Sequence, residues 1–255
     1  MTAPTPGVPN WVDLGTADLF DATRFYTGLF GWTAHVSPEP EAGGYTIFNL
    51  GDRAAAGAGP TFGEGQPTAW STYIATDDAD AVAARVEAAG GKVLVAPFDV
   101  LDQGRMAAFL DQAGAPFSVW QPGSMRGADI FDVPGALTWN ELTTRDVEGS
   151  TVFYGAVFGW TARTSSMGGA PYVVFEHGGQ IIAGLLPMLG AQWPVDLPPH
   201  WMVYFAVADC DEAAAQAVAL GGRISVRPTD FPMGRFAVLN DPQGGTFSIL
   251  ASSGR

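Results

Sequence analysis

Cysteines, histidines and basic residues are scarce in this chain. Its 255 residues include one cysteine, Cys210, and three histidines, so no internal disulfide can form and no cysteine cluster can hold zinc. Twelve Lys and Arg accompany 26 Asp and Glu, giving a net charge of −14. Nucleic-acid binding needs basic patches, so the charge excludes that partner. We expect a reduced, cytoplasmic protein.

Long apolar runs are also absent. No run reaches the roughly 18 residues that a membrane helix needs. The first residues, MTAPTPGVPN, lack the basic and apolar regions of a signal peptide. We therefore expect no membrane partner. The hydrophobic content of 47% suffices for packed cores. The acidity serves solubility, and it also leaves room for a cationic ligand.

What the sequence does have is an internal repeat. Residues 6–36 and 134–164 match at 14 of 31 positions at an offset of 128, without a gap. Such self-similarity indicates a repeated architecture. We expect two domains, residues 1–122 and 135–255, joined by a linker at 123–134.

Each repeat predicts the same order of elements. A short apolar strand is followed by an Asp that can cap a helix, Asp18 or Asp146. The helix carries Phe and Tyr and ends at Gly31 or Gly159. Three strands follow, and a second unit of this kind comes after a Pro- and Gly-rich loop. In that second unit, an apolar strand that ends at Pro97 or Pro228 precedes the final hairpin. The fold class is therefore α+β, with two βαβββ units per repeat.

These motifs resemble the vicinal oxygen chelate superfamily, which includes glyoxalase I, extradiol dioxygenases and bleomycin-resistance proteins. The resemblance rests on FYTGLFGW at 25–32, FYGAVFGW at 153–160, Asp78-Ala79-Asp80, Asp209-Cys210-Asp211 and Asp241-Pro242-Gln243-Gly244. It covers about residues 7–122 and 135–251. The chain looks most like tandem glyoxalase-like proteins of actinobacteria, some of which carry lyase or hydroxylase labels. The resemblance implies two fused glyoxalase-like domains, each with a curved mixed sheet around a cleft, and a role in secondary metabolism.

The resemblance also implies where a metal would bind. Metal-dependent members place His, Gln or Glu ligands on the concave face, at positions that this chain fills with Trp11, Ser71 and Ser118 in the first repeat and Trp139, Met202 and Ser248 in the second. The hairpin strand offers only small or apolar residues near Ala55 and Ala183. A catalytic metal usually has at least three protein donors. We expect no metal and no cofactor. In a shifted register His200 and Glu141 would form a weak pair, but the simpler interpretation is a polar residue at a strand start.

Strand alternation, taken with the family register, indicates what faces the clefts. Asp13 and Glu141 are the candidate acid/base residues, and Tyr73 and Tyr204 are candidates for orienting a substrate oxygen. The predicted binding wall consists of Trp11, Trp139, Ser118, Trp120, Met202, Ser248, Trp193 and His200. An alternative is that Asp13 and Glu141 pair with Arg105 and Arg235 or lie at a solvated strand edge. Phe25, Tyr26 and Phe30 have helical spacing that is more typical of a core than of a stacking site.

Two classes of function remain open. One is a metal-independent enzyme acting on a small organic, aromatic or carbonyl-bearing metabolite. The other is a non-catalytic binder, similar to bleomycin-resistance proteins, that sequesters a cationic aromatic drug. The longer side chain of Glu141 and the nearby Trp193 and His200 favour the second repeat as the working site. We expect a monomer or a homodimer.

Overall fold

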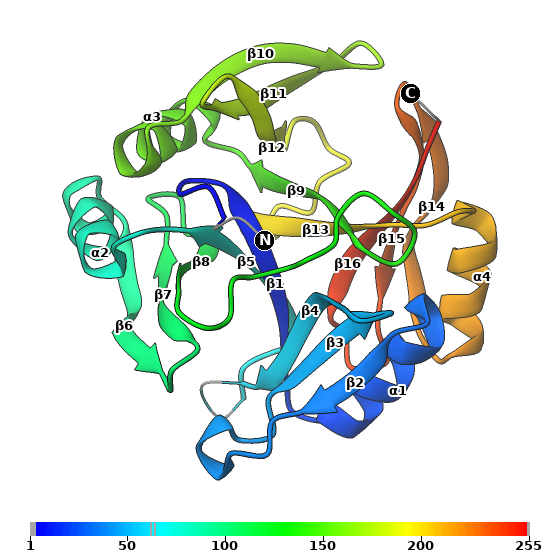
Figure 1. The fold of residues 1–255 in the computed structure, drawn as a ribbon. Helices are drawn as coiled ribbons and strands as arrows, with labels where there is room; N and C mark the ends of the chain where they lie inside the picture. Colours follow the sequence, from blue (N-terminus) through cyan, green and yellow to red (C-terminus); the bar gives the residue numbers. More distant parts are fainter. Residues whose placement is uncertain (1–3, 62, 64, 254–255) are drawn as a thin grey trace. The chain divides into compact units, whose positions relative to one another are not determined.

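Each repeat builds one mixed eight-stranded sheet. The computed structural model describes residues 4–61, 63 and 65–253 (Figure 1). The first sheet has the order β2-β3-β4-β1-β5-β8-β7-β6, and the second has the order β10-β11-β12-β9-β13-β16-β15-β14. The two orders are the same once the numbering is shifted by eight. The prediction of two fused glyoxalase-like sheets of βαβββ units is therefore confirmed.

The bounds of the elements follow the repeat. The strands of the first sheet are β1 Pro9–Thr16, β2 Thr33–Val36, β3 Thr46–Leu50, β4 Arg53–Pro60, β5 Ala69–Ala75, β6 Lys92–Val100, β7 Gly104–Leu110 and β8 Pro116–Pro122. Those of the second are β9 Leu137–Thr144, β10 Thr161–Met167, β11 Ala170–His177, β12 Gln180–Pro187, β13 His200–Ala206, β14 Arg223–Phe231, β15 Gly234–Asn240 and β16 Thr246–Ser252. The helices are α1 Leu19–Phe30, α2 Ala79–Ala88, α3 Val147–Phe158 and α4 Cys210–Ala219, with a 3-10 turn at Pro40–Ala42. No helix in the described part of the chain is both long and apolar enough to cross a membrane.

The helices begin and end where the sequence predicts. The Asp18 carboxylate accepts a hydrogen bond from the Asp21 backbone N–H at 2.9 Å, and Asp146 does the same for Gly149. These side chains satisfy donors that the first helical turn leaves unpaired. Gly31 ends α1 with φ +69°. This left-handed conformation is strained for other residues, which explains the glycine.

Two prolines do not end their strands as expected. An apolar strand was expected to end at Pro97 and at Pro228. In the structure Pro97 lies within β6 and Pro228 within β14. Both strands lie at the end of their sheets, and the pairing of β6 with β7 shifts register between Val95 and Phe98. An edge strand with a bulge tolerates a residue that cannot donate to the ladder.

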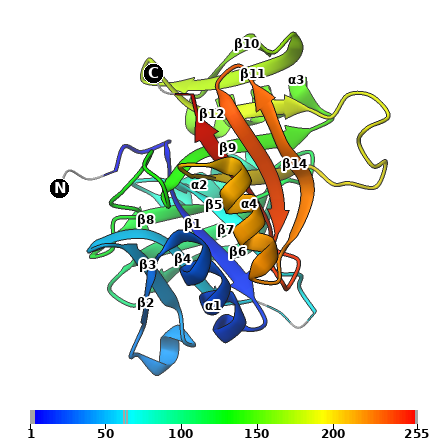
Figure 2. The same cartoon turned by 90° about the vertical axis from the view of Figure 1, so that its right-hand side faces the viewer.

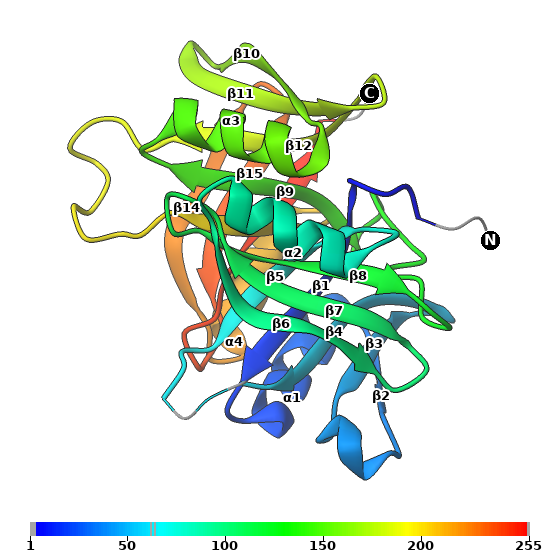
Figure 3. The same cartoon turned by 90° about the vertical axis from the view of Figure 1, so that its left-hand side faces the viewer.

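The buried residues form two compact units that each combine both repeats. The first unit comprises Thr72–Gly127, Asn140–Met202 and the described residues up to Trp11. The second comprises Val12–Ser71, Ala128–Trp139 and the described residues from Val203 onward. In the first unit α2 lies beside α3 (Figure 3), and in the second α1 lies beside α4 (Figure 2). The division into 1–122, 123–134 and 135–255 follows the sheets, and separate folding of those segments stays a prediction.

The core of each unit contains one hydrogen-bonded triad. In the second unit the Tyr26 hydroxyl donates to Asp241 Oδ2 at 2.9 Å and accepts from the Trp70 indole at 2.9 Å. In the first unit Tyr154 donates to Asp111 at 3.2 Å and accepts from Trp201 at 2.8 Å. These tyrosines belong to the FYTGLFGW and FYGAVFGW segments, and Phe25, Tyr26 and Phe30 are buried as core residues.

Burial controls the ionisation of the triads. It raises the pKa of Tyr26 and Tyr154 well above the usual 10.0, and the neighbouring carboxylates raise it further. Burial also raises the pKa of Asp241, although backbone N–H donors and the Tyr26 hydroxyl counteract it. Each tyrosine therefore stays protonated and donates to its carboxylate.

The first prediction concerns the tyrosine hydroxyl. Tyr26→Phe keeps the ring but leaves the buried Asp241 carboxylate without one of its donors. We expect the free energy of unfolding to fall by about 1–3 kcal/mol. Urea denaturation measures this, with Phe20→Ala, at a side chain 81% exposed, as a control that should change little. An unchanged midpoint for Tyr26→Phe would show that the triad does not stabilise the core.

The second prediction concerns alkaline pH. Because the folded pKa of Tyr26 and Tyr154 is raised, their contribution to stability is complete below the unfolded value of about 10 and is lost as pH rises above it. Each tyrosine should lower the unfolding free energy by up to about 1.4 kcal/mol per pH unit in that window. Urea midpoints measured from pH 8 to 11 check this. The double variant Tyr26→Phe, Tyr154→Phe should have a flatter profile, and a profile as steep as the wild type would contradict the assignment.

Candidate functional site

The opening strand of each repeat carries one candidate carboxylate. On β1, Val12 and Leu14 are fully buried in the core, and Asp13, on the opposite face, is half-buried. On β9, Leu142 is buried in the core and the neighbouring Glu141 is 6% exposed. This is the alternation that the sequence predicts.

Each carboxylate accepts a hydrogen bond from a tyrosine of its own repeat. In the second unit the Tyr45 hydroxyl donates to Asp13 Oδ2 at 3.2 Å. In the first unit the Tyr172 hydroxyl donates to Glu141 Oε2 at 2.6 Å. Tyr172 is 3% exposed, so the second pair is buried.

The strands beside the carboxylates contribute glycines. Asp13 lies opposite Gly57 on β4, and Glu141 lies opposite Gly184 on β12. Residues paired in register point to the same face of a sheet, so no side chain from β4 or β12 stands directly beside either carboxylate. A Cβ at Gly59 would come within 2.9 Å of the Tyr45 ring, so that glycine makes room for the tyrosine that contacts Asp13.

Sequence reasoning missed Tyr45 and Tyr172. Both tyrosines follow a glycine-rich turn at equivalent positions of the two repeats. That recurrence was the available signal. Which carboxylate each tyrosine would reach depends on the pairing of three strands, and a single sequence does not encode this pairing locally.

The remaining candidates are distributed over the two units. The first unit contains Trp11, Tyr73, Ser118, Trp120, Trp193, His200 and Met202 besides Glu141. The second contains Trp139, Tyr204 and Ser248 besides Asp13. Tyr73 pairs in register with Ser118, and Tyr204 with Ser248, so each tyrosine shares a face with a serine. Ser248 is fully buried, and its hydroxyl has no hydrogen-bond partner.

The tryptophans and His200 differ in their surroundings. Trp11 and Trp120 are buried, and the Trp120 indole donates to the Met125 carbonyl at 2.9 Å. Trp193 is half-buried in the loop before β13. His200 is the first residue of β13 and its Nδ1 lies 2.9 Å from the Pro198 carbonyl oxygen. Burial lowers the pKa of His200, and this hydrogen bond partly opposes the shift.

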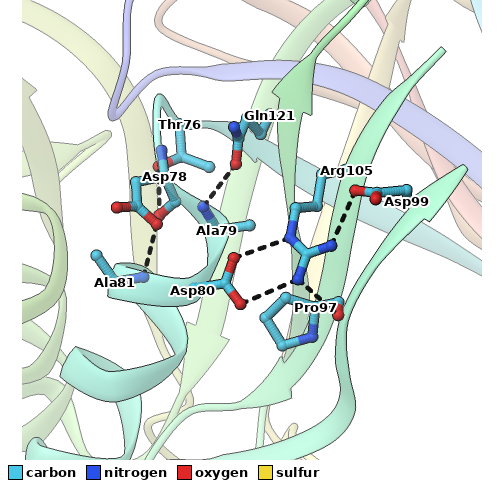
Figure 4. Close-up of polar contacts among 9 residues, drawn as sticks. All are labelled: Thr76, Asp78, Ala79, Asp80, Ala81, Pro97, Asp99, Arg105 and Gln121. Atoms are coloured by element: carbon cyan, nitrogen blue, oxygen red, sulfur yellow. Dashed lines mark hydrogen bonds and ion pairs between the residues drawn. The ribbon is translucent and has the colours of Figure 1, made fainter. Parts of the chain in front are cut away.

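Arg105 and Arg235 bind carboxylates other than those expected. Arg105 donates to Asp80 on α2 at 2.8 Å and to Asp99 on β6 at 2.8 Å (Figure 4). Arg235 makes the same pair of contacts with Asp211 and Asp230. The alternative in which these arginines neutralise Asp13 and Glu141 is therefore wrong. A hydrogen bond from Arg105 lowers the pKa of Asp80, so the pair stays ionised.

These contacts explain the Asp78-Ala79-Asp80 motif. Asp78 accepts from the Ala81 N–H at 2.9 Å and so caps α2 (Figure 4). Gln121 accepts from the Ala79 N–H at 3.0 Å. Asp80 then binds Arg105 on β7. The motif therefore attaches the helix to its sheet, which is a structural role rather than a catalytic one.

The donor set does not fit a metal ion. No group of three or more His, Cys, Asp or Glu side chains gathers in the described residues. At the positions that the family resemblance assigns to metal ligands stand Trp11, Ser71 and Ser118, and Trp139, Met202 and Ser248. Tryptophan offers only a donor N–H, and serine hydroxyls and one thioether bind divalent ions weakly. The chain's residues therefore do not match the ligand chemistry of the family's metal sites.

Comparison with known proteins places the chain in a class. The family model described as Glyoxalase/Bleomycin resistance protein/Dioxygenase superfamily matches residues 8–119 and 136–249. The chain belongs to this superfamily. It is 43% identical to "Anthracycline biosynthesis protein DnrV" of Streptomyces peucetius over 98% of this chain and 95% of that protein.

Solved structures agree with the fold. The Mn(II)-bound glyoxalase from Novosphingobium aromaticivorans has a TM-score of 0.64 and 18% identity, over 96% of this chain and 82% of that one. The 2,3-dioxygenase LapB from Pseudomonas sp. KL28 has a TM-score of 0.66 and 14% identity, over 98% and 94%. Identities this low support the shared fold alone.

The third prediction concerns metal content. Because Trp, Ser and Met occupy the usual ligand positions, the purified protein should carry far less than one zinc, iron, manganese or nickel ion per chain. Elemental analysis of protein purified without chelator measures this. A sample incubated with each metal and then dialysed is the control. One tightly held metal per chain that is lost in His200→Ala would overturn the assignment.

Proposed function

We propose that this protein binds a small aromatic or carbonyl-bearing metabolite and catalyses a metal-independent proton transfer on it. Glu141 acts as the acid/base group, and Tyr172 positions its carboxylate. The observation that carries the proposal is the 2.6 Å hydrogen bond between these two buried residues. The corresponding pair of Asp13 and Tyr45 is longer, at 3.2 Å, and more exposed.

The chemistry of the pair suits proton transfer. A carboxyl group held in one orientation within reach of a bound molecule can take up or return a proton. The Tyr172 hydroxyl restricts the rotation of Glu141, and the glycine at position 184 leaves the neighbouring strand position without a side chain. Preorganisation of this kind lowers the cost of aligning the reacting groups.

The nature of the substrate is supported by one relative. The protein of Streptomyces peucetius that is 43% identical is named for anthracycline biosynthesis. The name favours a polycyclic aromatic compound of secondary metabolism as the substrate class for this chain. Trp139, half-buried on β9 two residues before Glu141, would supply aromatic surface for such a molecule.

The second candidate function is binding without catalysis. The net charge of −14 favours a cationic ligand, which a protein could sequester through the same carboxylates. The two functions differ in what Glu141 does. In an enzyme its carboxyl group acts on the bound molecule, whereas in a binder its negative charge holds a cation.

The fourth prediction separates these functions. Glu141→Gln keeps the shape of the side chain and removes its proton chemistry. With an anthracycline as the first probe, followed by small aromatic ketones, an enzyme should keep its affinity and lose about 10²–10⁴-fold in turnover. Fluorescence titration measures binding, and mass spectrometry of the products measures turnover. A binder should instead lose affinity by about tenfold to a hundredfold, and the remaining affinity should depend less on salt.

Matched variants complete the experiment. Asp13→Asn makes the same change in the other repeat and should leave turnover nearly intact if Glu141 is the working residue. Tyr172→Phe should lower turnover with little effect on affinity, because it removes only the positioning hydroxyl. If turnover and affinity survive in both Glu141→Gln and Asp13→Asn, the carboxylates have no part in the function.

A further inference from the structure

The turns before β8 and β16 are equivalent but differ at one residue. In residues 111–115, Asp111 Oδ1 accepts from the N–H groups of Ala113 and Ala115 at 2.9 and 2.8 Å. In residues 241–245, Asp241 Oδ1 accepts in the same way from Gln243 and Gly245. Ala113 and Gln243 therefore hold the same place in the two turns.

The side chain of Gln243 fills a defined space in the second unit. Its Oε1 accepts from the Thr16 hydroxyl at 2.6 Å and from the Asp18 N–H at 3.2 Å. Its Nε2 donates to the Asp18 carbonyl at 2.9 Å. A primary carboxamide thus binds the end of β1 and the start of α1 through both its oxygen and its nitrogen.

The first unit has the same binding groups and no glutamine at this place. Thr144 and Asp146 are the equivalents of Thr16 and Asp18, and the Asp146 N–H donates to Thr144 Oγ1 at 3.2 Å, as Asp18 does to Thr16. A cavity of about 260 Å³ lies between Ala113, Thr144, Arg145, Asp146 and Pro199. Ala113, Thr144 and Asp146 in this lining are the equivalents of Gln243, Thr16 and Asp18 in the other unit.

The side-chain oxygen of Gln112, near the start of α3, lacks a hydrogen-bond partner. The Gln112 carboxamide lies over α3, with its Nε2 3.5 Å from Asp146 Oδ2 and 3.4 Å from Ser150 Oγ. Its Oε1 is buried and accepts no hydrogen bond. Buried acceptors without a donor are uncommon and costly, and this one belongs to a residue outside the lining of the cavity.

We infer that this cavity is a binding site for the primary carboxamide group of a small molecule. The Asp146 N–H and the Thr144 hydroxyl match an amide oxygen, and the Asp146 carbonyl matches an amide nitrogen, as their equivalents do for Gln243. A carboxylate has no N–H to donate to the Asp146 carbonyl. An ammonium group has no lone pair with which to accept a hydrogen bond from the Asp146 N–H. The neutral, two-sided amide satisfies both.

The surroundings limit the size and charge of the ligand. Arg145 donates one N–H to the Leu197 carbonyl and one to the Pro194 carbonyl at 2.6 Å each, so two of its donors are engaged by the loop before β13. The volume is below the usual range of drug-sized pockets, about 300–1,000 Å³. The site therefore suits an amide at the end of a molecule, whose remainder extends into solvent.

The fifth prediction tests this site with acetamide as the probe. Titration of ¹⁵N-labelled protein should shift the Asp146 amide signal saturably, with a dissociation constant in the millimolar range expected for so few atoms. Acetate and methylammonium, which each match one side only, should bind about tenfold more weakly or worse. Ala113→Gln copies the other repeat into the cavity and should abolish the acetamide shifts while raising the thermal midpoint.

The other unit supplies the matched control. Gln243→Ala should open an equivalent cavity, and acetamide should then shift the Asp18 amide saturably in that variant alone. Thr144→Val removes one lining hydroxyl and should weaken acetamide binding without filling the space. If acetamide shifts are linear in concentration, equal to those of acetate, or unchanged in Ala113→Gln, the cavity holds only water and the inference is wrong.

Discussion

The hydroxyl groups of Tyr26 and Tyr154 are the interaction on which the architecture depends. Each lies between a buried carboxylate and a tryptophan indole, donating to the first and accepting from the second. The tyrosine comes from one repeat and the aspartate from the other, so each triad joins the two repeats within one core. A buried carboxylate without donors would destabilise the folded state. Loss of any member of the triad would therefore leave a buried polar group without a partner.

Local patterns predicted the elements well because they act over a few residues. The capping aspartates, the terminal glycines and the apolar face of FYTGLFGW each depend on neighbours in sequence, and the structure confirms them. Partners that lie far apart were not predictable in this way. The Tyr172–Glu141 pair, the Arg105–Asp80 pair and the path of β6 through Pro97 all depend on strand order and register. The residue types were visible in the sequence, but their pairing was not.

The two repeats have diverged mainly toward a more polar first unit. Asn140 and Thr72 are buried there and share a hydrogen bond of 2.9 Å, whereas the equivalent positions of the second unit are Val12 and Val203. Ala113 replaces the glutamine that seals the helix entry in the other copy. A buried polar pair generally adds no stability over two packed valines. Its presence therefore points to a role in orientation or specificity. The same unit contains Glu141 and Tyr172, so these differences gather in one unit, to which both repeats contribute.

The described residues include three buried carboxylates, which differ in how they are held in place. Asp111, Glu141 and Asp241 are the three, and two of them are held by backbone N–H groups of their own tight turns. Those donors are part of the fold and cannot turn away without unfolding it. All three accept a tyrosine hydroxyl, but Glu141 lies on the strand β9 and not in such a turn. A carboxylate fixed by the backbone of its own turn is committed to structure, whereas our proposal uses the Tyr172 hydroxyl to position Glu141. Among the buried acids of the described residues, Glu141 is therefore the one to which we assign the proposed proton transfer.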